Sequence, residues 1–543
     1  MNLIHLLLRT SWVTVILAAI AGLLSGASSA GLIALINLTF SNTKLPVGLL
    51  AWSFAGLCLL LLLTTAVSQV LIARLAQGVV FDLRMLLNRR ILACPLRHLE
   101  EIGSPRLLAT LTEDVEAVSV ASTSISAICV NVAILVGCLL YLSWLSVPVF
   151  LFMLGFMVLG ILSHQILVTK GRRFLKLARE QQDQLFHHFR TTTEGTKELK
   201  LHRQRRQAFI SEDLQSAAKT SQHYRVAGMT IFAIAASWGL LLFFIPIGLL
   251  IFGLPQLATV PISVLSGYAL TIIFMMTPLR GILNTLPDLS RANIALEKIE
   301  SLGLLLAAQT TEPPLAPQFD INPGWKRLEL VEVTHAYRGE REAHSFILGP
   351  INLTFQPGEL VFLVGGNGSG KSTLVKLITG LYIPESGEIR VDGKLITDKN
   401  RDCYRQQFSV VFSDFYLFER LLGLDRPDLH TQVLDYLIKL ELDHKVEVKD
   451  DALSTTALSQ GQRKRLALLT AYLEDRPIYV FDEWASDQDP VFKQIFYRQL
   501  LPELKNKGKT VLVVSHDDRY FQVADRIIKL DYGKLEYDEP LYH

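Results

Sequence analysis

Three long stretches of the sequence carry almost no charged side chains, and they restrict the possible fold more than any other feature. They cover residues 10–73, 117–169 and 226–279, and Lys44 alone interrupts them. In a membrane, backbone hydrogen bonds must be satisfied within the spanning segment, as they are in a helix. Each stretch is too long for one span of about 20 residues and fits two spans joined by a turn. The sequence therefore predicts six transmembrane helices, near 12–40, 47–73, 118–142, 148–169, 226–252 and 262–285.

The basic side chains outside these stretches indicate the orientation of the chain. Residues 74–116 contain six Arg and residues 170–225 contain thirteen Lys or Arg, whereas the three short turns contain only Lys44. Because Lys and Arg are enriched on the cytoplasmic side of membranes, both basic segments and both chain ends are predicted to be cytoplasmic. The apolar residues of both basic segments have helical spacing, so we expect the membrane helices to continue into the cytoplasm and turn back near 101–106 and 194–201. These turns either contact another domain or form a solvated charged surface.

The composition supports an integral protein of the cytoplasmic membrane over other classes. Mean hydropathy is +0.32, half of the residues are hydrophobic and 19% are charged. The net charge of +2 gives no support to a nucleic-acid-binding surface. Five cysteines lack the spacing of a disulfide framework or a metal site, which fits a reducing compartment. The apolar N-terminus is longer than a signal peptide, so we interpret it as a retained span.

A glycine-rich stretch in the C-terminal half predicts a nucleoside triphosphate site. The apolar run 360–364 leads into Gly365-Gly-Asn-Gly-Ser-Gly-Lys-Ser-Thr373, and an amphipathic segment follows. This strand, glycine turn and helix start match the phosphate-binding loop, whose backbone N–H groups surround a polyphosphate. Lys371 is expected to reach the β- and γ-phosphates and Ser372 to hold Mg²⁺. The nucleotide-binding residues predicted here are Gly365, Asn367, Gly368, Ser369, Gly370, Lys371, Ser372 and Thr373.

An apolar strand that ends in two acids supplies the second part of this site. Residues 478–481 are followed by Asp482 and Glu483. In a phosphate-loop enzyme, the first carboxylate is placed to hold Mg²⁺ through water and the second to polarise the attacking water. We therefore predict that Asp482 holds the metal ion and that Glu483 is a catalytic residue. Lys371 is predicted to be catalytic as well.

A third motif identifies the kind of ATPase that the chain resembles. Leu458-Ser-Gln-Gly-Gln462 opens a helix about twenty residues before the acidic strand. Serine and glycine at a helix start can bind an anion. In this position the motif resembles the signature of the ABC ATPases, with Gln460 in place of the usual first glycine. The resemblance implies that Ser459, Gln460 and Gly461 contact ATP held by a second copy of the domain.

The resemblance assigns roles to further residues. His516, at the end of the strand 511–515, matches the histidine that contacts the γ-phosphate, and we count it as catalytic. Asp489 matches the loop after the catalytic glutamate, although Trp484, Asp487 and Gln488 depart from its usual form. Tyr337 matches the aromatic residue that stacks on adenine.

One departure concerns the metal site. Val410-Val-Phe-Ser-Asp-Phe-Tyr-Leu-Phe418 occupies the place of the family's glutamine loop, and Ser413 aligns with the glutamine that senses Mg²⁺. A hydroxyl can also coordinate this ion, so we predict Ser413 as a metal residue, assisted by Asp414.

The order of spans and ATPase resembles ABC exporters over nearly the whole chain. The resemblance implies an α-helical membrane domain over 1–300, a proline-rich linker over 301–325 and an α/β nucleotide-binding domain over 326–543, with ATP and Mg²⁺ as cofactors. The Phe-Ser-Asp-Phe-x-Leu-Phe form resembles the branch that exports cyclic peptides, lipopeptides and siderophore precursors. A homodimeric peptide exporter is therefore the predicted function. A lipid flippase and an ATP-gated, non-transporting membrane regulator are the alternatives.

Overall fold

The computed structural model describes residues 3–40, 46–257, 260–302, 325–337, 346–424, 428–449 and 451–541. They form two compact units. One contains Met1–Arg89 with Pro105–Leu305, and the other contains Arg90–Ser104 with Leu306–His543. The predicted boundaries 1–300, 301–325 and 326–543 stay predictions, because most of the linker lies outside the described residues.

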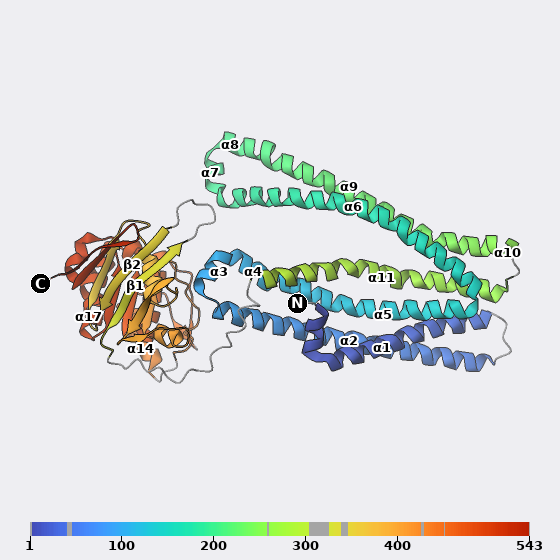
Figure 1. Ribbon diagram of the computed structural model, residues 1–543, viewed down its shortest axis with the longest axis horizontal. Coiled ribbons are helices and arrows are strands. Elements are labelled where there is room, and N and C mark those ends of the chain that lie inside the picture. The colour runs from blue at the N-terminus through green and yellow to red at the C-terminus, as the bar shows by residue number, and fades with distance from the viewer. Residues whose placement is uncertain are drawn as a thin grey trace. The chain divides into compact units, whose positions relative to one another are not determined.

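Long helices dominate the first unit (Figure 1). Six helical runs in the described residues are long and apolar enough to cross a membrane, as the charge-free stretches predict. Several continue far beyond the length of a span, because amphipathic, charged segments extend the apolar ones. The long helices are α1 (Leu3–Phe40), α2 (Val47–Ala93), α5 (Val115–Leu145), α6 (Val147–Glu194), α9 (Gln215–Gly248) and α11 (Ile262–Ser301).

Short helices mark the places where the long ones turn back or deviate. In the first basic segment, α4 (Ser104–Ala109) and a π-helical turn, η1 (Thr110–Asp114), lead into α5. In the second, α6 ends at Glu194, and α7 and α8 form the turn before α9 (Figure 1). Both turns lie where the sequence predicts them. The elements not yet named in this unit are α7 (Thr196–Leu201), α8 (Arg203–Ala208), η2 (Phe209–Leu214), η3 (Leu249–Gly253) and α10 (Leu254–Leu257).

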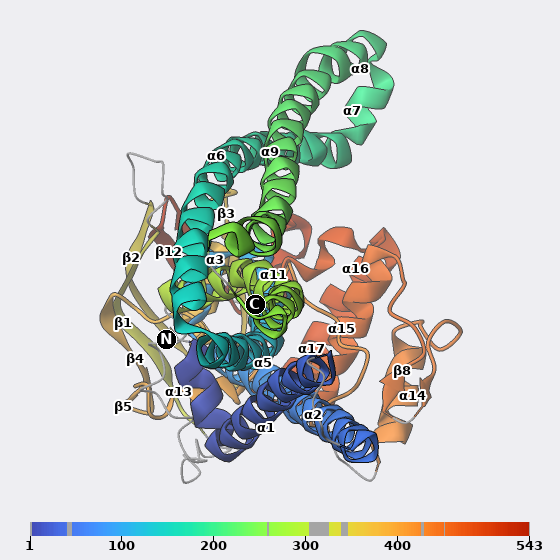
Figure 2. The same cartoon turned by 90° about the vertical axis from the view of Figure 1, so that its right-hand side faces the viewer.

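Two groups of helices pack within this unit. Helix α5 packs against α1 and α11, and α6 runs beside α9 over most of its length (Figures 1 and 2). Polar contacts join the first group: Asn37 of α1 donates to the Tyr141 hydroxyl of α5 at 2.9 Å and accepts from the Ser266 hydroxyl of α11 at 2.9 Å. Near the basic end, Lys298 of α11 pairs with Asp114 at 3.0 Å. Such bonds fix the register of helices whose surfaces are otherwise apolar.

The second unit is built on two main sheets. A mostly parallel sheet has the order β12-β11-β3-β10-β9-β6, and an antiparallel sheet has the order β2-β1-β4-β5. The parallel sheet consists of β3 (Leu360–Gly365), β6 (Phe408–Val411), β9 (Ile478–Asp482), β10 (Thr510–Val514), β11 (Arg526–Asp531) and the antiparallel β12 (Lys534–Pro540). The other sheet consists of β1 (Leu328–Tyr337), β2 (Phe346–Phe355), β4 (Ser386–Val391) and β5 (Lys394–Leu395), and β7 (Val448–Lys449) pairs with β8 (Ala452–Leu453).

Helices cover the parallel sheet, and its strands are therefore apolar throughout. The residues of β9 and β10 are all buried, as expected for central strands covered on both faces. The helices are α12 (Lys371–Ile378), α13 (Arg401–Arg405), α14 (Leu429–Lys439), α15 (Gln460–Glu474), α16 (Pro490–Ile495) and α17 (Leu501–Asn506), with the shorter turns η5 (Trp484–Asp487), η6 (Phe496–Leu500) and η7 (Asp518–Val523).

A short helix from the first basic segment belongs to this second unit. Helix α3 (Leu96–Ile102) contributes Glu100, which pairs with Lys376 of α12 at 2.7 Å and accepts from the Tyr382 hydroxyl. Arg97 pairs with Glu385 at 2.7 Å. Leu96 packs against the apolar core between the two sheets. The helix that leads into the turn predicted near 101–106 therefore contacts the rest of this second unit, and some of its charged side chains are paired there.

Candidate active site

The carboxyl ends of four parallel strands converge on one edge of the sheet. Gly365 ends β3, Asp482 ends β9, Val514 ends β10 and Val411 ends β6. The order β3-β10-β9-β6 places these ends in a row. Asp482 lies at this edge, and the segments that follow the strands carry the other predicted catalytic and metal residues: Lys371, Ser372, Ser413, Glu483 and His516. Open α/β sheets bind ligands at this edge.

The phosphate-binding loop has the backbone that its glycines predict. Gly365 has φ +148°, and a Cβ there would lie 2.2 Å from the carbonyl oxygen of Leu530. Gly370 has φ +98° and precedes α12, where a Cβ would lie 2.9 Å from Leu348. Any side chain at either position would clash or be strained, so glycine is required at both.

The groups of this loop fit a polyphosphate. Lys371 is 5% exposed, and its Nζ donates to the carbonyl oxygens of Gly365 and Gly366 at 3.0 and 2.9 Å. Burial lowers the pKa of Lys371, whereas the carboxylates of Glu483 and Asp482 raise it. The buried Ser369 hydroxyl has no hydrogen-bond partner among the described residues. Anionic oxygens would supply acceptors to both groups, because phosphate is a strong acceptor for N–H and O–H donors.

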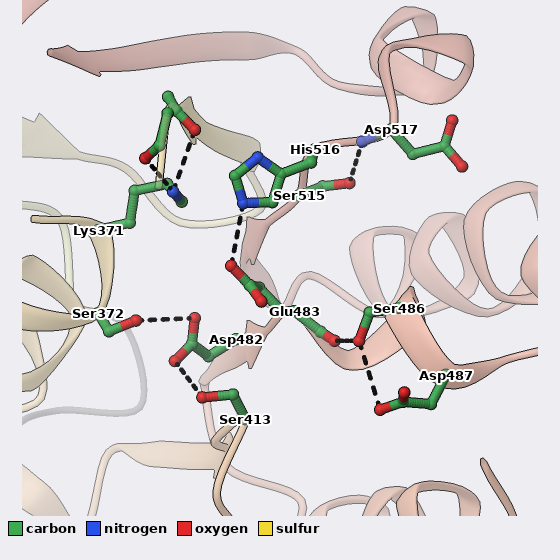
Figure 3. Close-up of polar contacts among 12 residues, drawn as sticks. Lys371, Ser372, Ser413, Asp482, Glu483, Ser486, Asp487, Ser515, His516 and Asp517 are labelled. Atoms are coloured by element: carbon green, nitrogen blue, oxygen red, sulfur yellow. Dashed lines mark hydrogen bonds and ion pairs between the residues drawn. The ribbon is translucent and has the colours of Figure 1, made fainter. Parts of the chain in front are cut away.

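Three oxygen-bearing side chains meet at the predicted metal position (Figure 3). The Ser372 hydroxyl lies 3.5 Å from Oδ1 of Asp482, and the Ser413 hydroxyl lies 3.3 Å from Oδ2 of the same carboxylate. Burial raises the pKa of Asp482, and the hydrogen bonds from the two serines lower it. Two hydroxyls around a carboxylate are hard oxygen donors, the kind that Mg²⁺ prefers. The structure therefore brings together all three predicted metal residues.

The predicted catalytic glutamate and the predicted catalytic histidine are also in contact. Nε2 of His516 lies 3.0 Å from Oε1 of Glu483, and both side chains are partly exposed (Figure 3). Glu483 has φ +50°, a left-handed conformation that is uncommon for a residue with a side chain. The chain thus turns sharply after β9 and directs this carboxylate toward His516.

The signature residues form a second surface at the start of α15, where no hydrogen bond between described residues joins them to Lys371, Ser372 or Glu483. Ser459 is the N-cap of α15, and its hydroxyl accepts from the Gln462 backbone at 3.4 Å in a capping box. Ser459 and Gln460 are exposed. The Gly461 carbonyl accepts from Nε2 of Gln488 at 2.9 Å. Asp489 caps α16 by accepting from the Phe492 backbone, and it pairs with Arg465 at 2.6 Å.

Several residues that sequence reasoning missed hold this surface together. Lys464 and Arg465 of α15 bond to the loop 483–489, and Trp484 is buried beneath it. Helical spacing contained a signal for Lys464, because it shares one face of α15 with Leu468 and Ala471, which are buried.

The remaining predicted residues are placed as follows. Asn367 and Gly368 are exposed in the phosphate-binding loop, and Thr373 follows Ser372 in the first turn of α12. Tyr337 ends β1, but its side chain lies outside the described residues. Asp414 is exposed, and the residue of this loop that contacts Asp482 is Ser413.

Comparison with known proteins agrees with this arrangement. Residues 11–254 match the family described as ABC transporter transmembrane region, and residues 348–486 match the family described as ABC transporter. The chain is 37% identical over 535 residues to the ATP-binding protein SyrD of Pseudomonas syringae pv. syringae, an alignment that covers 97% of this chain and 94% of the relative. The chain belongs to the ABC transporter family.

Other relatives of this ABC transporter handle different cargoes. An ATP-dependent lipid A-core flippase of Haemophilus influenzae is 27% identical over 516 residues, covering 90% of this chain and 84% of the flippase. The alpha-hemolysin translocation ATP-binding protein HlyB of Escherichia coli is 34% identical over 200 residues, covering 35% of this chain and 28% of HlyB. The transporter is thus an integral membrane exporter whose ATPase domain hydrolyses ATP, and the predicted fold class is confirmed.

Proposed function

We propose that this ABC exporter acts as a homodimer that uses ATP to move a peptide-like molecule, such as a cyclic peptide, a lipopeptide or a siderophore precursor, out of the cytoplasm. The observation that carries the proposal is the division of the ATP site between two surfaces. One surface holds Lys371, Ser372, Asp482 and Glu483, and the other presents Ser459 without a nucleotide site of its own.

The first surface has the groups for phosphoryl transfer to water. Lys371 would bind the β- and γ-phosphates, and Ser372, Asp482 and Ser413 would hold Mg²⁺. Mg²⁺, when bound, neutralises charge on the phosphate oxygens. Glu483 would orient the attacking water and accept its proton, and His516 would hold the Glu483 carboxylate in place through the 3.0 Å contact.

The second surface needs a partner to act. Ser459 is exposed at the N-terminus of α15, where its hydroxyl caps the helix, and a helix N-terminus favours the binding of an anion. A second copy rotated about a two-fold axis would pair each surface with the other one twice. The complete assembly then has two ATP sites.

A docked helix connects the ATP site to the membrane half. Lys371 begins α12, and Lys376 of the same helix pairs with Glu100 of α3. Since α3 follows α2 after a break of two residues, a shift of α12 on ATP binding would be transmitted to a membrane-spanning helix. In thermodynamic terms, ATP binding at the nucleotide site and cargo binding in the membrane half would then be coupled.

The sequence of the spans supports a peptide-like cargo over lipid A. Residues 10–40, 46–73, 117–169 and 226–279 contain no Lys or Arg. The phosphates of a lipid A headgroup would need cationic partners at membrane depth, because an unpaired charge there is costly.

Purified transporter in lipid nanodiscs provides the test. We expect a cyclic lipopeptide to stimulate ATPase activity several-fold and lipid A to leave it unchanged, and Glu483→Gln to retain ATP binding while turnover almost disappears. Stimulation by lipid A alone would favour the flippase alternative. Normal ATPase activity in Glu483→Gln would refute the catalytic assignment, and ATP binding without uptake of any cargo into inside-out vesicles would favour the regulator.

A further inference from the structure

A buried lysine in α15 contacts the loop that carries the proposed general base. The side chain of Lys464 is 2% exposed. Its Nζ lies 2.9 Å from the backbone carbonyl oxygen of Glu483, 2.9 Å from the Ser486 hydroxyl and 2.7 Å from Oδ2 of Asp487. An ammonium group has three N–H donors, and all three have an acceptor here.

These contacts are directed at the strained point of the loop. Glu483 adopts the left-handed conformation, which a residue with a Cβ keeps only where its surroundings hold it. Its carbonyl oxygen accepts from Lys464. It also accepts from the Ser486 hydroxyl at 2.8 Å, as Figure 3 shows. The same residue carries the carboxylate that contacts His516. The direction of this carboxylate therefore depends on a carbonyl that Lys464 holds.

Aromatic packing prevents Lys464 from moving independently of the loop. Trp484 is 1% exposed, and its Nε1 donates to the Lys464 carbonyl oxygen at 2.8 Å. The Trp484 ring stacks on Phe496 with ring centroids 4.3 Å apart. Helix α15 and the turn η5 are thus bonded in both directions, from Lys464 to Glu483 and from Trp484 to Lys464.

We propose that Lys464 is a positioning residue for ATP hydrolysis, which fixes the Glu483 backbone to the helix that presents Ser459. The proposal rests on the roles of Glu483 and Ser459 proposed above. Glu483 serves the nucleotide of its own chain, whereas Ser459 serves the nucleotide of the partner chain. A displacement of the signature surface in one ATP site therefore changes the direction of the catalytic carboxylate in the other.

Lys464→Met tests this role in the full-length transporter in nanodiscs. Methionine fills a similar volume but leaves the Glu483 carbonyl without its charged donor. We expect kcat to fall about tenfold or more, which corresponds to about 1.4 kcal/mol in the barrier, while KM for ATP and the affinity for a fluorescent ATP analogue stay within about twofold of wild type. Lys464→Gln keeps an N–H donor for the carbonyl and is expected to recover most of kcat.

Two further variants separate positioning from general stability. Lys505→Met removes the ion pair with Asp525, which lies away from the site, and should leave kcat unchanged. Asp487→Asn removes the charge partner of Lys464 but leaves the contact of Lys464 with Glu483. Because the Asp487 carboxylate is 45% exposed and water can replace it, kcat should stay within about twofold of wild type. If Lys464→Met does not fold, Ser486→Ala is tested instead. We expect kcat of the Ser486→Ala variant to fall several-fold at unchanged ATP affinity.

Several outcomes would overturn the inference. They are wild-type kcat in Lys464→Met, equal loss of kcat in the Met and Gln variants, parallel loss of ATP affinity and kcat, or a larger effect of Asp487→Asn than of Ser486→Ala. Glu483→Gln is measured beside them. If Glu483→Gln keeps its turnover, the proposed catalytic role fails; if Glu483→Gln is inactive and Lys464→Met is normal, only the role of Lys464 fails.

Discussion

The two surfaces of the ATPase unit are built in opposite ways. On the phosphate-loop surface, Lys371 is buried and bonds to its own loop, and Asp482 lies between two hydroxyls. On the signature surface, Ser459 and Gln460 are exposed, and the strong contacts lie behind them, from Lys464 and Arg465 to the loop 483–489. The first surface has the groups that bind a ligand, and the second has a rigid support for groups that face outward. This difference is expected of a site that two chains complete together.

The largest expected effect comes from combining two inactive chains. Ser459→Arg should block the signature surface and Glu483→Gln the catalytic carboxylate, so each homodimer should be inactive. A mixed dimer has one site with both groups intact and one with both altered. We expect it to recover about half of the wild-type ATPase rate, because a symmetric dimer has two equivalent sites.

Two different affinity tags allow the mixed dimer to be purified alone and its phosphate release measured. Mixing separately purified homodimers without exchange of subunits is the matched control and should show no recovery. An inactive mixed dimer in which both chains bind ATP would contradict a site shared between two chains.

The metal side of the phosphate-loop surface gives the next largest effect. Ser413→Ala removes the hydroxyl that lies 3.3 Å from Asp482. The loss of one such hydrogen bond or ligand costs about 1 kcal/mol, so the Mg²⁺ concentration for half-maximal ATPase activity should rise several-fold. A titration of ATPase rate against free Mg²⁺ measures this shift. Ser409→Ala, a buried serine on β6 without a metal contact, is the control, and equal Mg²⁺ curves for both variants would remove Ser413 from the metal site.

A smaller effect is expected on the signature surface. Gln460→Gly restores the usual glycine of the family's signature at an exposed position in the first turn of α15. Glycine costs about 1 kcal/mol within a helix but much less at its end, so the ATPase rate should change by less than about twofold. A tenfold change in the rate would show that the Gln460 side chain itself contacts the nucleotide.

The smallest effect concerns a residue on neither surface. His335 of β1 is 1% exposed and stacks on Tyr382 with ring centroids 4.8 Å apart. Burial lowers the pKa of His335, with a smaller contribution from the charge of Arg97. The pKa of His335 in the unfolded chain is about 6.5, and in the folded unit it is lower. Between these two values the unfolded chain binds the proton more readily than the folded unit, so the free energy of unfolding decreases as the pH falls through this range.

Calorimetry of the full-length transporter at about pH 7.5 and pH 5.5 measures this loss, for which 1 kcal/mol corresponds to about 2–4 °C in Tm. His335→Phe keeps the stacked ring and should reduce the acid shift. An identical shift in this variant would exclude His335 as its source.

The residues predicted for the phosphate-loop surface lie in motifs that are local in sequence, and the fold brings these motifs to one edge of the sheet. Gly365, Gly370 and Lys371 lie within one turn, and the carboxyl end of β9 brings Asp482 to the same edge. The supports of the signature surface were not predicted, because the charged neighbours of Lys464 in sequence suggest a solvated residue, although its helical spacing from Leu468 and Ala471 places it on the buried face. Docking of Glu100 on Lys376 joins residues 276 positions apart, a distance at which a single sequence contains no pairing signal.

The docking of α3 has a pharmacological consequence. Glu100, Lys376 and Tyr382 form a small, partly exposed polar junction outside the nucleotide site. A compound that separated Glu100 from α12 would leave the phosphate-binding residues in place. On the coupling proposed above, such a compound would act as an uncoupler: the exporter would continue to consume ATP while cargo stayed in the cell. Resistance would then arise in residues that do not touch nucleotide.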